Sequence, residues 1–267
     1  MPPHDPVLHV AGRGEPALLF VHGAACDHTD WAPQMAALSN AHRVAALDLP
    51  GHGAAPAPAV ADVGALAAAV TAAKAGLGGP VVLVGHSLGC RVVLEAYHQA
   101  PADVRGIVLV DANLLAPPGQ GEAARRAMEA RIETLGVSHY LAAVFEQMFV
   151  EGANPALRSR IVERASRWDP AVARSVLLDI VRWDSEAAER VLRSVRVPLL
   201  MVQSTARDER SRRVSLKPGQ TTPWTALIQR LAPGADLRIV ENVGHFPQLE
   251  APGAVADAIS GFCTKLH

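Results

Sequence analysis

Short runs of apolar residues recur along the chain, and each run ends in turn-forming residues. Because these runs do not alternate with polar residues, they are typical of strands buried on both faces, as in a parallel sheet. Helical patterns separate the runs, which predicts an α/β fold: a mostly parallel sheet covered by helices on both faces. The runs cover residues 17–23, 43–51, 80–87, 104–112, 197–204 and 237–244, and the helical patterns cover residues 30–38, 60–77, 87–99 and 254–262.

The pattern changes between the fourth and fifth of these runs, where Ala, Arg, Glu and Met recur at helical spacing. This change predicts a helical insertion between two strands of the sheet. With 267 residues, 49% of them hydrophobic, the chain is long enough for one large core with an insertion. We therefore expect a core formed by residues 1–113 and 196–267 and a helical cap formed by residues 114–195.

Charge and hydropathy argue against several classes of function. The net charge is −1, and no Lys/Arg cluster is dense enough for a nucleic-acid or membrane surface. The basic stretch 207–213 contains Asp208 and Glu209, which is typical of a solvated loop. The N-terminus lacks a signal-peptide pattern, and no apolar run reaches the roughly 18 residues of a membrane span. The three cysteines are widely spaced, which fits a reducing compartment. We expect a cytoplasmic monomer or homodimer that binds neither nucleic acid nor membrane.

One motif, VVLVGHSLGC at residues 81–90, joins an apolar run directly to a helical pattern. Glycines at positions 85 and 89 allow the strand and the helix to approach closely, and the turn between them holds Ser87 in strained backbone with its hydroxyl exposed. Such a turn lies at the carboxyl ends of the strands, where open α/β sheets bind ligands. The N–H groups at the start of the helix stabilise an anion there. This G-x-S-x-G pattern predicts that Ser87 is a nucleophile.

Three further motifs are His22-Gly23, DLPGHG (48–53) and GHFPQLEAP (244–252). Together with GHSLG they make the whole chain resemble the α/β-hydrolase fold family with a helical cap inserted after the sixth strand. The resemblance implies that His245 is the catalytic base, since it follows the last strand and completes the chain order Ser, acid, His. It also implies that the backbone N–H groups of Ala24 and Leu88 form the oxyanion hole.

The acid that orients His245 has two candidates. In the family it usually follows the strand before the histidine strand, in a G-x-x-D turn. Here Ser204 replaces that glycine and Asp208 lies one residue later than the pattern requires. A second family position directly follows the strand after the nucleophile helix, where Asp111 ends the run GIVLVDA. We prefer Asp111 because it ends an uninterrupted strand, and Asp208 is the alternative.

A Ser-His-Asp triad with an oxyanion hole transfers an acyl group to water. Because the nucleophile is Ser and not Asp, the related dehalogenases and epoxide hydrolases do not fit. The apolar insertion favours a small-molecule partner, a small to medium neutral ester or lactone. The side chains expected to contact this substrate are His28, Trp31, Phe145, Met148 and Phe246.

Several other activities use the same constellation, since fold and triad do not define the reaction. A carbon–carbon-bond hydrolase, a perhydrolase, a hydroxynitrile-lyase-like enzyme and a ligand receptor that retains the triad all remain alternatives. Phosphate-binding glycine motifs and metal-ligand spacings are absent from the sequence. We therefore expect no cofactor and no metal.

Overall fold

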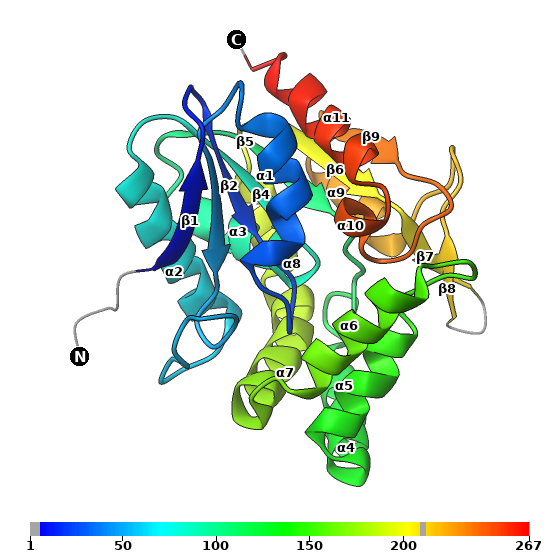
Figure 1. Ribbon diagram of the computed structural model, residues 1–267. Helices are drawn as coiled ribbons and strands as arrows, with labels where there is room; N and C mark the ends of the chain where they lie inside the picture. Colours follow the sequence, from blue (N-terminus) through cyan, green and yellow to red (C-terminus); the bar gives the residue numbers. More distant parts are fainter. Residues whose placement is uncertain (1–5, 209–211, 267) are drawn as a thin grey trace.

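The computed structural model describes residues 6–208 and 212–266. Within these residues the main sheet has seven strands in the order β1-β3-β2-β4-β5-β6-β9 (Figure 1). β1 runs antiparallel to β3, and all the other neighbours are parallel. The strands are β1 (Val7–Ala11), β2 (Ala17–Val21), β3 (Val44–Asp48), β4 (Val81–His86), β5 (Val104–Val110), β6 (Leu199–Gln203) and β9 (Asp236–Ile239).

Helices cover both faces of this sheet. Alternate residues of a strand point to opposite faces, so Leu18 and Phe20 of β2 pack with α1 and α11, whereas Leu19 and Val21 pack with α2 and α3. All four side chains are fully buried, which makes the sheet the centre of the core. The flanking helices are η1 (His28–Trp31), α1 (Ala32–Leu38), α2 (Val63–Leu77), α3 (Leu88–Gln99), α8 (Ala188–Ser194), α9 (Pro223–Leu231), α10 (Pro247–Glu250) and α11 (Pro252–Cys263).

The six strands predicted from apolar runs all occur, as β2, β3, β4, β5, β6 and β9. The sequence pattern misses β1, because this edge strand is exposed along much of its length and carries no continuous apolar run. It also misses a small antiparallel hairpin formed by β7 (Thr205–Arg207) and β8 (Arg213–Ser215), which lies in the stretch expected to be a solvated loop.

Four longer helices lie between β5 and β6 and gather beyond one end of the sheet (Figure 1). They are α4 (Gly121–Leu135), α5 (Val137–Glu146), α6 (Pro155–Ser166) and α7 (Pro170–Glu186). The part-buried indole N–H of Trp168 donates to the Gly51 carbonyl at 2.9 Å, and Arg91 on α3 forms a buried bidentate pair with Asp184 on α7 at 2.7 Å. These polar contacts connect the four helices to the sheet layer.

The position of this insertion corrects the strand count expected from the family. The insertion follows β5, the fifth strand of the described chain, and not a sixth strand, because β1 alone precedes β2 there. The proposed division into residues 1–113 with 196–267 and residues 114–195 stays a prediction.

None of the helices in the described ranges is long and apolar enough to cross a membrane.

Candidate active site

Ser87 lies at the turn between β4 and α3, and its backbone has a φ of +55°, which residues other than glycine rarely adopt. The glycines on either side are required by the packing. A Cβ at Gly85 would lie 2.3 Å from the Gly89 carbonyl oxygen, and a Cβ at Gly89 would lie 2.3 Å from the Val21 carbonyl oxygen. The close approach of strand and helix expected from the G-x-S-x-G pattern is therefore present, and Ser87 remains partly exposed at the turn.

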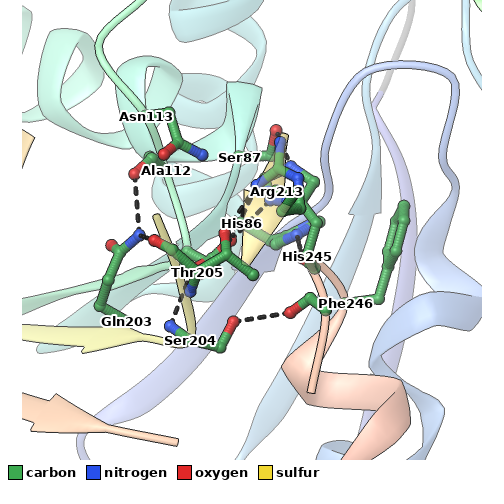
Figure 2. A network of polar contacts seen from close by, with 12 residues as sticks. His86, Ser87, Ala112, Asn113, Gln203, Ser204, Thr205, Arg213, His245 and Phe246 are labelled. Carbon is green, nitrogen blue, oxygen red and sulfur yellow. Dashed lines mark hydrogen bonds and ion pairs between the residues drawn. The ribbon is translucent and has the colours of Figure 1, made fainter. Parts of the chain in front are cut away.

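His245 lies in the loop between β9 and α10 and reaches Ser87 from across the sheet (Figure 2). Its Nε2 is 2.9 Å from the Ser87 Oγ, and its Nδ1 is 2.7 Å from Asp111 Oδ2. Since a carboxylate only accepts hydrogen bonds, Nδ1 carries the proton and Nε2 has its lone pair directed at the serine hydroxyl. The loop is held by the His245 N–H, which donates to the Met148 carbonyl at 2.8 Å, and by His86 Nε2, which donates to the His245 carbonyl at 2.7 Å.

Asp111 directly follows β5 and is fully buried, with a φ of +35°. Its Oδ1 accepts from the backbone N–H groups of Ser204 and Thr205, each at 2.8 Å, and its Oδ2 accepts from the Thr205 hydroxyl at 2.7 Å. Burial alone would raise the pKa of this carboxyl. The hydrogen bond and charge of His245, the charge of Arg213 and the Thr205 hydroxyl outweigh burial and lower the pKa. The carboxylate is therefore ionised and fully hydrogen-bonded beside His245.

Asp208, the alternative acid, lies on the β7–β8 hairpin. Its carboxylate accepts from the backbone N–H of Arg212 at 2.8 Å and from the Arg212 Nε at 2.9 Å. The structure thus brings Ser87, His245 and Asp111 together and places Asp208 in a different contact. The residues after β6 bind Asp111 through their N–H groups, so they support an acid from β5.

The expected oxyanion donors lie on either side of Ser87. Leu88 is the first residue of α3, and N–H groups in the first turn of a helix have no acceptor within that helix. Ala24 follows β2 in a loop that approaches Ser87 closely: a Cβ at Gly23 would lie 3.2 Å from the Ser87 Cβ. Glycine at position 23 therefore lets the Ala24 loop lie against the serine.

Three other motif histidines are buried and have backbone contacts, as expected from their motifs. His22 donates from Nδ1 to the Gly23 carbonyl at 2.8 Å, and His52 donates from Nδ1 to the Pro50 carbonyl at 3.1 Å. Burial lowers the pKa of both, and burial together with the charge of His245 lowers the pKa of His86 to about 3. All three imidazoles are therefore neutral near pH 7.

The architecture and this arrangement point to one family, and the sequence agrees. The profile of the alpha/beta hydrolase family matches residues 18–258. The chain belongs to the alpha/beta hydrolase family.

Three individual relatives of this hydrolase share 23% to 30% of their aligned residues with it. The chain is 30% identical over 268 residues to the dihydrolipoyllysine-residue acetyltransferase component of the acetoin cleaving system of Pseudomonas putida, covering 97% of this chain but only 66% of that protein. It is 26% identical over 257 residues to 2-succinyl-6-hydroxy-2,4-cyclohexadiene-1-carboxylate synthase of Salmonella newport, covering 94% of this chain and 96% of the synthase. Among solved structures, the thermophilic esterase from Thermogutta terrifontis has a TM-score of 0.80 at 23% identity, covering 98% of this chain and 94% of the esterase, which shows the shared fold.

An aromatic cluster borders His245 in the hydrolase. The fully buried Phe246 ring lies 5.5 Å from the His245 ring, 6.4 Å from Phe145 and 5.4 Å from Phe149. Met148 belongs to the same region, because its carbonyl holds the His245 N–H. The structure therefore gathers Phe145, Met148 and Phe246 beside the histidine. Phe149 joins them, and its place four residues after Phe145 is the pattern that could have indicated it.

The two remaining expected substrate contacts lie elsewhere. His28 binds Asp48 Oδ1 through its backbone N–H at 2.8 Å and through Nδ1 at 2.9 Å, and its ring stacks on His9 with centroids 3.5 Å apart. Trp31 is fully buried, and its ring centroid lies 5.0 Å from that of Phe20, on the face of the sheet that α1 and α11 cover. These positions explain both side chains by packing, and their contact with substrate stays a prediction.

A cleft of about 500 Å³ lies between the loops after β2 and β3 on one side and helix α6 and the segment between α6 and α7 on the other. Ala25, one residue after the expected oxyanion donor, lines one side of it, and Trp168 lines the other. Arg164 and Arg167 also line the cleft, but Arg164 is paired with Asp27 and Asp30 and Arg167 with Glu163. The cleft therefore has a mixed polar and apolar lining with its charges largely balanced, and it is less apolar than the sequence of the insertion predicts.

Arg213 is the residue at this site that sequence reasoning missed. It belongs to the stretch expected to be solvated, yet it begins β8 with only 4% of its side chain exposed. Its Nη1 donates to the Thr205 hydroxyl at 2.6 Å and lies 3.2 Å from His245 Nδ1 and 3.6 Å from Asp111 Oδ2 (Figure 2). Burial lowers the pKa of its guanidinium to about 10, so Arg213 is still a cation at neutral pH. A buried cation therefore adjoins the Ser-His-Asp arrangement, next to the Asp111 carboxylate.

Proposed function

We propose that this hydrolase cleaves carboxylic esters or lactones of small to medium size through an acyl-enzyme on Ser87. The observation that carries the proposal is the chain of contacts from Ser87 Oγ to His245 Nε2 at 2.9 Å and from His245 Nδ1 to Asp111 Oδ2 at 2.7 Å. Family membership and the likeness of the fold to an esterase support the same reaction class.

The first half of the reaction forms the acyl-enzyme. As Ser87 Oγ attacks the carbonyl carbon, its proton moves to His245 Nε2, and Asp111 stabilises the imidazolium. The carbonyl oxygen takes the negative charge, which the N–H groups of Ala24 and Leu88 stabilise, each worth about 3 kcal/mol in comparable sites. When the carbon–oxygen bond to the alcohol breaks, His245 returns the proton to the leaving oxygen.

The second half releases the acid. Water takes the place of the alcohol, and His245 removes its proton as the water oxygen attacks the acyl carbon. Collapse of the second tetrahedral intermediate breaks the bond to Ser87 Oγ, which regains its proton from His245. The products are one carboxylic acid and one alcohol, and the enzyme returns to its starting state.

The test is release of p-nitrophenol from esters of increasing acyl-chain length, measured for the wild type beside Ser87→Ala. We expect repeated turnover by the wild type and a loss of about 10⁶-fold in kcat for the variant, the loss typical of removing a triad nucleophile. The optimal chain length then measures the acyl pocket. One slow turnover by the wild type, or activity that survives in Ser87→Ala, would reject the esterase proposal.

A second candidate is supported by one observation: the chain aligns over nearly its whole length with a synthase whose name denotes formation of a cyclohexadiene carboxylate. A lyase or an enzyme that acts on carbon–carbon bonds would turn over esters weakly with the same residues. It would consume the substrate of the synthase reaction or a diketone strongly, and this activity would depend on Ser87. Assay of the synthase reaction and of a diketone substrate beside the ester series separates these candidates.

A further inference from the structure

The feature that triad chemistry does not require is the buried guanidinium of Arg213. A positive charge 3.2 Å from His245 Nδ1 opposes the imidazolium that forms when His245 accepts a proton. Its Nε is buried without a hydrogen-bond partner in the described part of the chain, so the side chain is desolvated at a cost that ordinary surface placement would avoid. Because burying this cation beside His245 and Asp111 is costly, we expect it to have a function.

We infer that Arg213 is a positioning residue that lowers the proton affinity of His245 and so keeps the hydrolase active in acidic solution. This inference rests on the proposed function, in which neutral His245 is the base. The contact geometry carries it: Arg213 reaches His245 directly and reaches Asp111 through Thr205.

Thr205 links the cation to the acid. Its hydroxyl donates to Asp111 Oδ2 at 2.7 Å and accepts from Arg213 Nη1 at 2.6 Å, so its single proton is directed at the carboxylate. Protonated His245 would then be a second cation beside one carboxylate. The neutral state of His245 is favoured, with its Nδ1 proton held on Asp111 and its Nε2 lone pair on Ser87.

The other charged or titratable groups around His245 supply less of this effect than Arg213, or none of it. The His86 ring on β4 is tilted against the His245 ring, with centroids 4.9 Å apart, but burial keeps the His86 imidazole neutral. Glu250 on α10 is occupied by backbone N–H groups, and burial raises its pKa. Arg207 on β7 also lowers the pKa of His245, but less than Arg213 does. Burial, followed by the charge of Arg213, lowers this pKa to about 4.

The experiment is the pH dependence of kcat/KM for the best p-nitrophenyl ester, between pH 4 and pH 8, because the acid limb reports the base in the free enzyme. Each protein is kept at pH 7 and mixed into the assay buffer, and an aliquot returned to pH 7 checks that activity is recovered. We expect the wild-type acid limb to lie well below 6.5, the ordinary pKa of histidine. In Arg213→Met the limb should move upward by about one pH unit or more, the usual effect of removing a neighbouring charge.

Three comparisons separate charge from structure. Arg213→Lys keeps the cation and should restore most of the low limb. Arg213→Gln removes the charge but retains a donor for Thr205, and its acid limb should move upward as in Arg213→Met. It therefore provides the same test if Arg213→Met fails to fold. Arg212→Met, on the same hairpin with an exposed side chain, should give the wild-type profile.

The outcomes are distinct for the two proposals. If Ser87→Ala keeps the ester activity of the wild type, the proposed function fails and the pH profile is not interpreted. If turnover depends on Ser87 but the wild-type limb lies at 6.5 or above, the inference about Arg213 is wrong, whatever the variants do. Equal acid limbs for the wild type, Arg213→Met and Arg213→Gln would overturn it as well.

Discussion

Replacing Asp111 by Asn tests the acid assignment at the level of single protons. The backbone N–H groups of Ser204 and Thr205 both donate to Asp111 Oδ1, so the amide of Asn has to place its oxygen there. Its NH₂ group then takes the place of Oδ2 and donates toward His245 Nδ1, where a carboxylate oxygen now accepts at 2.7 Å. His245 must change tautomer, and its proton moves to Nε2. The lone pair that should accept the Ser87 proton is lost.

The expected size of the effect follows from this change of tautomer. The same exchange of an acid for an amide in a serine triad lowers kcat by about 10⁴-fold, or about 5.5 kcal/mol of barrier. Most of the fold should remain, because Asn has nearly the volume of Asp and retains the bonds to Oδ1. The assay is p-nitrophenyl ester turnover at pH 7.5, with thermal unfolding measured on the same preparation.

Asp208→Asn is the matched control. Its carboxylate bonds Arg212 on the hairpin, so we expect turnover within a few-fold of the wild type. Asp111→Asn that retains a tenth of the wild-type kcat, or Asp208→Asn that loses more than a hundredfold, would refute the argument from hydrogen-bond polarity.

Three further predictions concern stability and the nucleophile turn. Arg91→Met leaves the buried Asp184 carboxylate without its bidentate partner, and should lower the free energy of unfolding by about 3–5 kcal/mol, or the Tm by about 6–20 °C. Adding Asp184→Leu should recover part of this loss in thermal unfolding, and equal Tm values for the single and double variants would count against it. Gly89→Ala places a Cβ 2.3 Å from a carbonyl oxygen of β2, and the displaced turn should reduce kcat by about 100-fold; unchanged turnover would show that the packing relaxes freely. Burial lowers the pKa of His86 to about 3 and that of His245 to about 4, whereas the unfolded state takes up these protons near 6.5. Stability should therefore fall as the pH drops from 6.5 to 4, and a Tm that is flat over this range in scanning fluorimetry would contradict the burial of neutral imidazoles.

The five inner strands of the main sheet, β2 to β6 in the chain, were predictable because nearly all of their residues are buried. Residues 81–84 read as an unbroken apolar run, since every position of β4 packs against a helix layer. β1 escaped because its side chains are largely exposed, and the β7–β8 hairpin escaped because it is short and rich in charge. A run of apolar residues indicates a buried strand, so short or exposed strands at the edge of the molecule are hard to predict from the sequence.

The turn that holds Ser87 was also predictable from the sequence. Gly85, Ser87 and Gly89 are neighbours in the chain, and the clash that each added Cβ would cause involves only the strand and helix that meet there, together with the adjacent β2. A local motif is therefore sufficient to predict the strained serine and the helix start that follows it.

The acid and the buried cation depended on the tertiary structure. The strand order puts β4, β5, β6 and β9 side by side, so that Ser87, Asp111, Thr205 and His245 meet at one edge although they are far apart in the chain. The sequence offered two candidate acids of equal chemistry, and the structure places Asp111 beside His245, with its carboxylate bound by the N–H groups that follow β6. Arg213 was indistinguishable from a solvated arginine until the hairpin turned it inward, because the energy of a charge depends on what surrounds it in space and not on its neighbours along the chain.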